Sequence, residues 1–252
     1  MRTDDERWLR RFHTPRRASA PPLVICPHAG TGASAYQPFS RAFGATHAVT
    51  VLQYPGRQDR ADEAAATTVP ELAGRALDAY AAAPGTADRP VTVFGHSMGG
   101  VVAFEFARAA EAAGIPVALL VVSAVVPAGR VADQPEHPSD DDAIVDRLVA
   151  LNGTSAEVLA SRDIMRMALP ALKADYAAVD AYSCPATATV DAPILALGGD
   201  ADPIVTPGDL YGWAAHTTGG LSVTLFAGGH FYLNDDVDLV AGAVADAVPA
   251  VR

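Results

Sequence analysis

The chain has 252 residues, half of them hydrophobic, and a formal net charge of −11 at pH 7. This acidic balance argues against nucleic acid as a partner, because phosphate binding needs a dense basic patch. The longest apolar run, Ile115 to Val126, is shorter than the roughly 20 residues of a membrane span, so we expect neither a transmembrane helix nor a membrane partner.

The length and the amino terminus predict a single cytoplasmic domain. A chain of 252 residues can bury a large core, and α/β proteins of this size are commonly one domain. The first residues, MRTDDERWLRR, carry acids and lack an apolar stretch, so they do not resemble a secretory signal. Cys26 and Cys184 are far apart and lack metal-ligand spacing, so we expect two reduced thiols.

The first predicted element is a short amphipathic helix. Trp8, Leu9 and Phe12 recur at helical spacing, which predicts a helix over residues 4–12, and a Pro-rich linker follows at 15–22. Six of the 18 basic residues lie within the first seventeen positions. They form either a basic corner that could meet an acidic partner or the solvated face of this helix.

A Gly-rich loop follows the first predicted strand, Leu23 to Cys26. Its residues Gly30, Gly32 and Ala35 fit the dinucleotide-binding pattern G-x-G-x-x-A. The next strand, His47 to Tyr54, lacks the acidic residue at its end that would bind the ribose, so we reject this interpretation. We expect the loop instead to supply an oxyanion-hole N–H, as the corresponding loop of α/β-hydrolases does.

The centre of the chain holds a strand, a sharp turn and a helix. Val91 to Phe94 predicts a buried strand, and Val101 to Ala113 predicts a helix. Between them Gly95, Ser97 and Gly99 fit the G-x-S-x-G nucleophile elbow, in which a side chain at either glycine would collide with the neighbouring strand or helix. This context predicts Ser97 as the nucleophile.

The remaining pattern predicts a mostly parallel sheet with helices on both faces. Further helices are expected at 70–83 and 236–248, and further strands at 117–123, 193–197 and 222–226. The alternation stops after Pro127, where we expect helices at 140–151, capped by Ser139, and at 161–182. We predict that residues 128–190 form a helical lid insertion within one α/β-hydrolase domain, residues 1–252.

Acyl transfer by serine needs a base and a carboxylate that holds this base in one tautomer. In α/β-hydrolases they follow in the order Ser, Asp, His, on loops after strands. His230 follows the strand at 222–226 and is the candidate base. Asp200 and Asp202 both follow the strand at 193–197; we choose Asp202 as the acid and expect Asp200 to stabilise the turn.

The other histidines are given lesser roles. His96 belongs to the elbow but would point away from the reaction, and His28 lies in the oxyanion loop. We expect surface or packing positions for the remaining ones, His13, His47, His137 and His216.

Two backbone N–H groups are candidates for the oxyanion hole. One is that of Met98, at the start of the helix, and the other is that of Ala29 or its neighbour Gly30. Each such donor typically lowers the barrier by roughly 3 to 4 kcal/mol. This chemistry requires no metal, flavin or nucleotide, and no ligand cluster suggests one, so we expect no cofactor.

Several motifs occur together along the chain: Trp8-Leu9-Arg10-Arg11-Phe12, Cys26-Pro-His-Ala-Gly30, Gln53-Tyr-Pro-Gly-Arg-Gln-Asp-Arg60, Phe94-Gly-His-Ser-Met-Gly-Gly100, Leu172-Lys-Ala-Asp-Tyr176 and Gly229-His-Phe231. Through these motifs nearly the whole chain resembles a family, the type II (editing) thioesterases of polyketide and non-ribosomal peptide assembly lines. This resemblance implies the triad Ser97, Asp202 and His230, with Met98 and Ala29 as oxyanion donors. It also implies hydrolysis of acyl groups from the phosphopantetheine arm of acyl or peptidyl carrier proteins.

Two other functions remain open at this point. A broad-specificity carboxylesterase would use the same triad, and a catalytically silent hydrolase-fold protein would use none of it. Carrier proteins are usually acidic, so we expect a local basic or apolar patch, such as that around Arg10 and Arg11, to meet them. We expect a monomer.

Overall fold

A computed structural model describes residues 7–86, 89–153 and 161–249. In these ranges the strands form one seven-stranded sheet in the order β1-β3-β2-β4-β5-β6-β7. Their bounds are Leu9–Arg10 (β1), Pro22–Cys26 (β2), Ala48–Leu52 (β3), Val91–His96 (β4), Val117–Ser123 (β5), Ile194–Gly199 (β6) and Leu221–Phe226 (β7). Only β1 runs antiparallel to its neighbour within this sheet; the other described pairs are parallel. The predicted mostly parallel sheet is confirmed.

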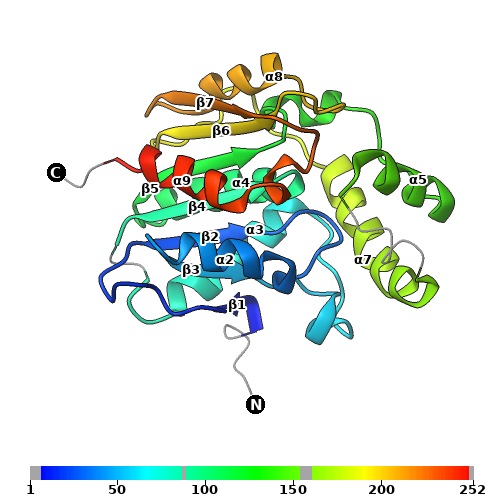
Figure 1. The fold of residues 1–252 in the computed structure, drawn as a ribbon, viewed down its shortest axis with the longest axis horizontal. Helices are drawn as coiled ribbons and strands as arrows, with labels where there is room; N and C mark the ends of the chain where they lie inside the picture. Colours follow the sequence, from blue (N-terminus) through cyan, green and yellow to red (C-terminus); the bar gives the residue numbers. More distant parts are fainter. Residues whose placement is uncertain (1–6, 87–88, 154–160, 250–252) are drawn as a thin grey trace.

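Helices cover both faces of the sheet (Figure 1). Helices α2 (Gln37–Phe43) and α9 (Val237–Ala247) lie side by side on one face, and α3 (Val69–Ala82) and α4 (Met98–Ala112) on the other. Side chains alternate along a strand, so β5, which is buried from Leu119 to Ser123, contributes to both layers: Leu120 packs towards α4, and Val121 packs towards α2 and α9. This explains why its sequence is continuously apolar.

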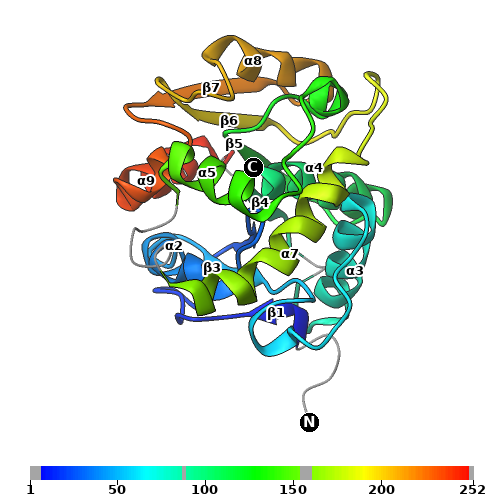
Figure 2. The same cartoon turned by 90° about the vertical axis from the view of Figure 1, so that its right-hand side faces the viewer.

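The segment between β5 and β6 lies at one end of the sheet, apart from both helical layers (Figure 2). It contains the 3₁₀ helix η3 (Ala128–Asp133), α5 (Asp141–Leu151) and α7 (Arg162–Asp180). Ile144 of α5 packs against Leu172 and Tyr176 of α7. The predicted cap Ser139 is wrong by one residue, because the side chain of Asp140 accepts the free amides of Asp142 and Ala143.

The predicted helix at 4–12 is wrong in its second half, and residues 4–6 lie outside the described residues. Leu9 and Arg10 form β1, which pairs with Leu52 and Val51 of β3. Without this partner β3 would be the sheet edge, so pairing satisfies backbone groups that a helix would leave open. Trp8 remains buried, with the guanidinium of Arg60 at 4.5 Å from its ring centroid.

In the described ranges, two α-helices were not predicted from the sequence. One is α2, which follows directly on η1 (Ala33–Tyr36), and the other is α8 (Pro207–Tyr211), which leads into η4 (Gly212–His216). Both α2 and α8 have Pro in their first turn, where no hydrogen bond is lost. The short 3₁₀ helices η2 (Gln58–Arg60) and η5 (Tyr232–Asn234) complete the described elements.

Two smaller findings bear on the sequence predictions. Cys26 and Cys184 are free thiols, the first of them fully buried. Of the helices in the described ranges, none combines the length and the apolar character needed to cross a membrane.

Candidate active site

Ser97 alone forms the turn between β4 and α4. Its φ and ψ of 54° and −126° are a strained conformation that lifts its side chain off the end of the strand. A Cβ at Gly95 would overlap the carbonyl oxygen of Gly99, and a Cβ at Gly99 would overlap that of Cys26 in β2. The predicted collisions with the helix and the strand are therefore confirmed, and both glycines are needed for the turn.

Ser97 opens into a cavity of about 560 Å³. Its inner wall contains Ser97, Met98, His230 and the loop at 28–31. Its outer wall comes from the segment between β5 and β6 and is mainly apolar, with Val131, Leu148, Leu151, Met165, Ala168, Leu172 and Val179. A chain of apolar groups bound here would reach the serine.

His230 is held by Asp202. The two side chains are almost completely buried, and His230 Nδ1 lies 2.8 Å from Asp202 Oδ2. The other carboxylate oxygen, Oδ1, accepts the backbone amides of Ile204 at 2.8 Å and Val205 at 3.2 Å. The carboxylate favours the tautomer of His230 that carries its proton on Nδ1. The other ring nitrogen, Nε2, can then accept a proton.

Asp200 makes a different contact. Its Oδ1 accepts the backbone N–H of Gly228 at 3.0 Å, and the amide of Ala201 donates to the carbonyl of Gly228 at 2.9 Å. These bonds fasten the loop after β6 to the loop after β7. Asp200 thus joins the two loops that carry Asp202 and His230.

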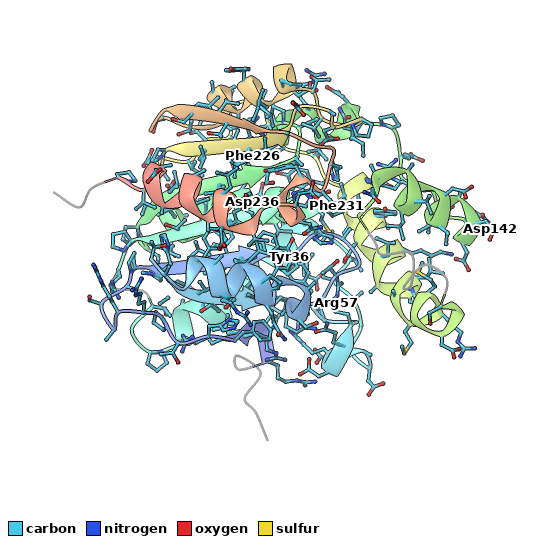
Figure 3. All side chains as sticks on the ribbon, in the orientation of Figure 1. Tyr36, Arg57, Asp142, Phe226, Phe231 and Asp236 are labelled. Atoms are coloured by element: carbon cyan, nitrogen blue, oxygen red, sulfur yellow. The ribbon has the colours of Figure 1, made fainter. Side chains whose placement is uncertain are left out.

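Ser97 and His230 line the same cavity, and no hydrogen bond joins their side chains within the described residues. Catalytic hydrogen bonds of this kind often tighten only when a substrate is bound. The centroid of the His230 ring lies 5.2 Å from the ring centroids of His96 and of Phe231. Figure 3 shows Phe231 at the end of the molecule that α7 occupies.

The histidines beside His230 are neutral. Burial, followed by the charge of His230, lowers the pKa of His28 to about 3. The same two causes, in the same order, lower the pKa of His96 well below its usual value. Both imidazoles are therefore uncharged near neutral pH and add no positive charge next to the candidate base.

A second serine–histidine pair lies deeper in the fold. His96 Nδ1 is 2.9 Å from Ser123 Oγ, which in turn is 2.7 Å from the hydroxyl of Tyr232. His96 and Ser123 are both completely buried, and neither lines the cavity. This pair links the ends of β4 and β5 to η5 and cannot meet a substrate as Ser97 can.

The two candidate oxyanion donors flank Ser97. Met98 is the first residue of α4, where backbone N–H groups are free and the helix dipole is positive. Ala29 and Gly30 lie in the loop after β2 and line the cavity. The N–H of Gly30 already donates to Asp175 Oδ2 at 2.7 Å, which removes it from the two alternatives.

Sequence reasoning missed the polar residues of the outer wall. His137, expected at the surface or in packing, lines the cavity together with Arg147, Tyr176 and Asp180. His137 Nδ1 lies 2.5 Å from Asp180 Oδ1, and its ring stacks on Tyr176 at 4.2 Å. These residues come from three separate stretches of the insertion, so no local pattern marks them.

A family model matches most of the chain. Residues 21–248 fit the model described as a thioesterase domain. The chain is 40% identical over 242 residues to the probable cadicidin biosynthesis thioesterase of Streptomyces griseus, covering 96% of this chain. It is 36% identical over 253 residues to the thioesterase PikA5 of Streptomyces venezuelae, covering 100% of this chain and 89% of that protein.

Some relatives are longer than this chain. It spans 66% of the length of the cadicidin protein, and 16% of the phenyloxazoline synthase MbtB of Mycobacterium tuberculosis, to which it is 39% identical over 240 residues.

Solved structures agree with the fold. The type II thioesterase BorB from the borrelidin biosynthetic cluster superposes with a TM-score of 0.83 at 37% identity, covering 98% of this chain and 100% of that one.

Proposed function

This chain belongs to the thioesterase domain family, and on that basis we propose that it hydrolyses acyl thioesters carried on the phosphopantetheine arm of carrier proteins. It has the α/β-hydrolase fold, and the type II thioesterase resemblance of its sequence is matched by BorB over nearly the whole chain. The thioesterase PikA5 also matches the whole chain. The proposal concerns the substrate, the partner and the residues that act on them. One observation carries it: the elbow serine and the Asp202-bound histidine line the same apolar cavity.

In the acylation step, Ser97 Oγ attacks the thioester carbonyl carbon while its proton passes to His230 Nε2. The carbonyl oxygen becomes an oxyanion that accepts the N–H groups of Met98 and Ala29. When the C–S bond breaks, the leaving sulfur takes the proton from His230. The acyl group is then an ester of Ser97.

In the deacylation step, water attacks this ester carbonyl and gives a proton to His230 Nε2. The same two N–H groups hold the second oxyanion. Collapse returns the proton to Ser97 Oγ and releases a carboxylic acid. Throughout both steps Asp202 keeps the ring in one tautomer and stabilises the imidazolium, without itself taking the proton.

We assign the segment 128–190 the role of a lid within a single domain. Its helices α5 and α7 supply the outer cavity wall, so the position of these helices controls which acyl groups fit. The phosphopantetheine arm is long and thin, and the apolar wall suits the acyl chain at its end. The carrier protein itself would dock outside the cavity, and we propose that the enzyme acts as a monomer in the cytoplasm.

The thioester assignment is tested against an oxygen ester. The kcat/KM of the enzyme is measured for an acyl-carrier thioester and for the oxygen ester of the same acyl group, and we expect a preference for the thioester. A clear preference for the oxygen ester would favour the carboxylesterase alternative instead. No turnover of either, with no labelling of Ser97 by a fluorophosphonate, would favour a binding protein.

A further inference from the structure

A buried ion pair joins the outer wall to the body of the domain. Asp175 of α7 and Arg57, in the turn after β3, are each about 95% or more buried. Arg57 Nη1 donates to Asp175 Oδ2 at 2.5 Å, and Nη2 donates to Oδ1 at 2.8 Å. A bidentate pair of this kind fixes both the distance and the angle between the two segments. Figure 3 shows Arg57 at the end of the sheet near α7.

The same carboxylate also holds the oxyanion loop. Asp175 Oδ2 accepts the backbone N–H of Gly30 at 2.7 Å, across 145 positions of sequence. Gly30 has a φ of +73°, and a Cβ there would press on Leu172, one turn before Asp175. The loop is thus held by a hydrogen bond to α7, and Leu172 lies so close that a side chain at position 30 would have to displace it.

The turn after β3 holds the loop from its other end. Gln53 Oε1 accepts the N–H of Ala33 at 2.7 Å, and Gln53 Nε2 donates to the carbonyl of Arg57 at 3.1 Å. The guanidinium of Arg57 also donates to the carbonyl of Pro55 at 3.2 Å and lies 5.3 Å from the centroid of the Tyr54 ring. These contacts restrain Arg57 in addition to its ion pair with Asp175.

We propose that Asp175 and Arg57 are positioning residues for the oxyanion hole, and that through them the geometry of the oxyanion hole depends on the position of α7. The inference rests on the proposed function, in which the N–H of Ala29 is the second oxyanion donor. By fixing the N–H of Gly30, Asp175 sets the orientation of the Ala29–Gly30 peptide and so keeps the preceding N–H aimed at the cavity. When α7 moves away, the carboxylate leaves with it and the loop loses this restraint.

Neighbouring residues of α7 have different roles. Leu172 and Tyr176, on the same helix, line the cavity that the acyl chain would enter, and Asp175 between them accepts the N–H of Gly30 in the loop. A substrate that holds α7 against the cavity therefore also keeps the oxyanion loop in place. This links acyl recognition to catalytic competence through a single helix.

Three variants and one control separate positioning from folding. Asp175→Asn removes the charge, and Arg57→Lys keeps the charge but loses the bidentate geometry. The pair Arg57→Met with Asp175→Leu replaces the buried ions by apolar groups, which often preserves or raises stability. Asp163→Asn removes a carboxylate at the exposed start of the same helix, where it pairs with Arg166.

The measurements are kcat, KM, the melting temperature and the inhibition constant of an acyl trifluoromethyl ketone, whose adduct with Ser97 carries an oxyanion. Titration of Ser97 with a fluorophosphonate counts the folded sites in each sample. For both single variants we expect kcat per folded site to fall about 10- to 100-fold, with KM changed less than about threefold. The ketone should bind weaker by the same factor, and the control should match the wild type.

The double apolar variant decides between the two roles. Under the proposal it melts near the wild-type temperature and is still slow, because no acceptor remains for Gly30 N–H. A double variant that regains kcat together with stability would overturn the proposal, as would single variants with wild-type kcat per folded site. If the wild type itself fails to turn over thioesters, the proposed function is wrong. This result is distinct from a failure of the positioning proposal, which requires an active wild type and variants with the same kcat per folded site.

Discussion

Asp202 and His230 are joined so that neither ring nor carboxylate can turn freely. One oxygen of Asp202 lies 2.8 Å from His230 Nδ1, and the other accepts the amides of Ile204 and Val205. The orientation of the imidazole is therefore set by the backbone of the loop after β6, through a single carboxylate. The loop after β7 sets the position of the imidazole ring, and Asp202 sets its orientation.

The two aspartates of that loop form a matched pair for mutation. We expect Asp202→Asn to lower kcat by roughly 10³- to 10⁴-fold, because an amide in this place favours the wrong tautomer of His230. Asp200→Asn keeps an oxygen for the N–H of Gly228 and should change kcat less than about threefold. Steady-state kinetics on an acyl-pantetheine thioester distinguishes them. A reversed ranking would assign the acid to Asp200.

The two serine–histidine pairs can be told apart by labelling. Ser97→Ala should abolish covalent labelling by a fluorophosphonate and leave circular dichroism unchanged. Ser123→Ala should keep labelling but lower the free energy of unfolding by about 1 to 3 kcal/mol, since His96 and Tyr232 lose a buried partner. Mass spectrometry of the intact protein reads out the label. Loss of labelling in Ser123→Ala alone would point to the buried pair.

Glycine replacements should act in opposite directions at two places. A Cβ at Gly99 would overlap the carbonyl oxygen of Cys26, so Gly99→Ala should lower the free energy of unfolding by about 3 kcal/mol or more. Gly242 is exposed within α9 and has open space around it, so Gly242→Ala should raise that free energy by about 0.5 to 1 kcal/mol. Urea denaturation measures both. Equal effects of the two changes would contradict the packing of the elbow.

Acid should destabilise the fold through its buried histidines. Burial lowers the folded-state pKa of His47 to about 4. Below the unfolded value near 6.5, the unfolded chain binds a proton that the folded protein does not, so stability is full above that pH and is lost as the pH falls towards about 4. Each such histidine costs about 1.4 kcal/mol per pH unit in this window.

The variant His47→Gln isolates this contribution. His96 and His28 remain and shift in the same direction, so the variant should still lose stability in acid, but less steeply by one proton. Urea midpoints between pH 7.5 and 4.5 give the two slopes. Identical slopes would mean that His47 takes up its proton equally in the folded and unfolded states.

Much of the fold follows from local pattern in the sequence. The bounds predicted for β5 are those observed, because the run from Val117 to Val122 is apolar throughout and the strand ends on the small polar residue Ser123. The elbow strand runs two residues past the predicted Phe94, and α4 begins three residues before the predicted Val101. Sequence places the turn, but only the geometry of Ser97 shows that one residue forms it.

The errors at β1 and at the Arg57–Asp175 pair have a common physical cause, which is contact between distant segments. Leu9 and Arg10 are a strand because β3 needs a neighbour, and no spacing within residues 4–12 reports that need. Arg57 and Asp175 stand out in the sequence only as parts of motifs. Their contact spans 118 positions and is visible only in three dimensions.

The ion pair between Arg57 and Asp175 sets a condition for engineering. A chimaera that exchanges the segment between β5 and β6 for that of another thioesterase, to alter the acyl group accepted, brings its own residue for position 175 but keeps Arg57 from the recipient. If the donor segment lacks an aspartate there, a buried guanidinium is stranded without its counter-charge. Donor segments should therefore be chosen together with the turn after β3, as one transferable pair.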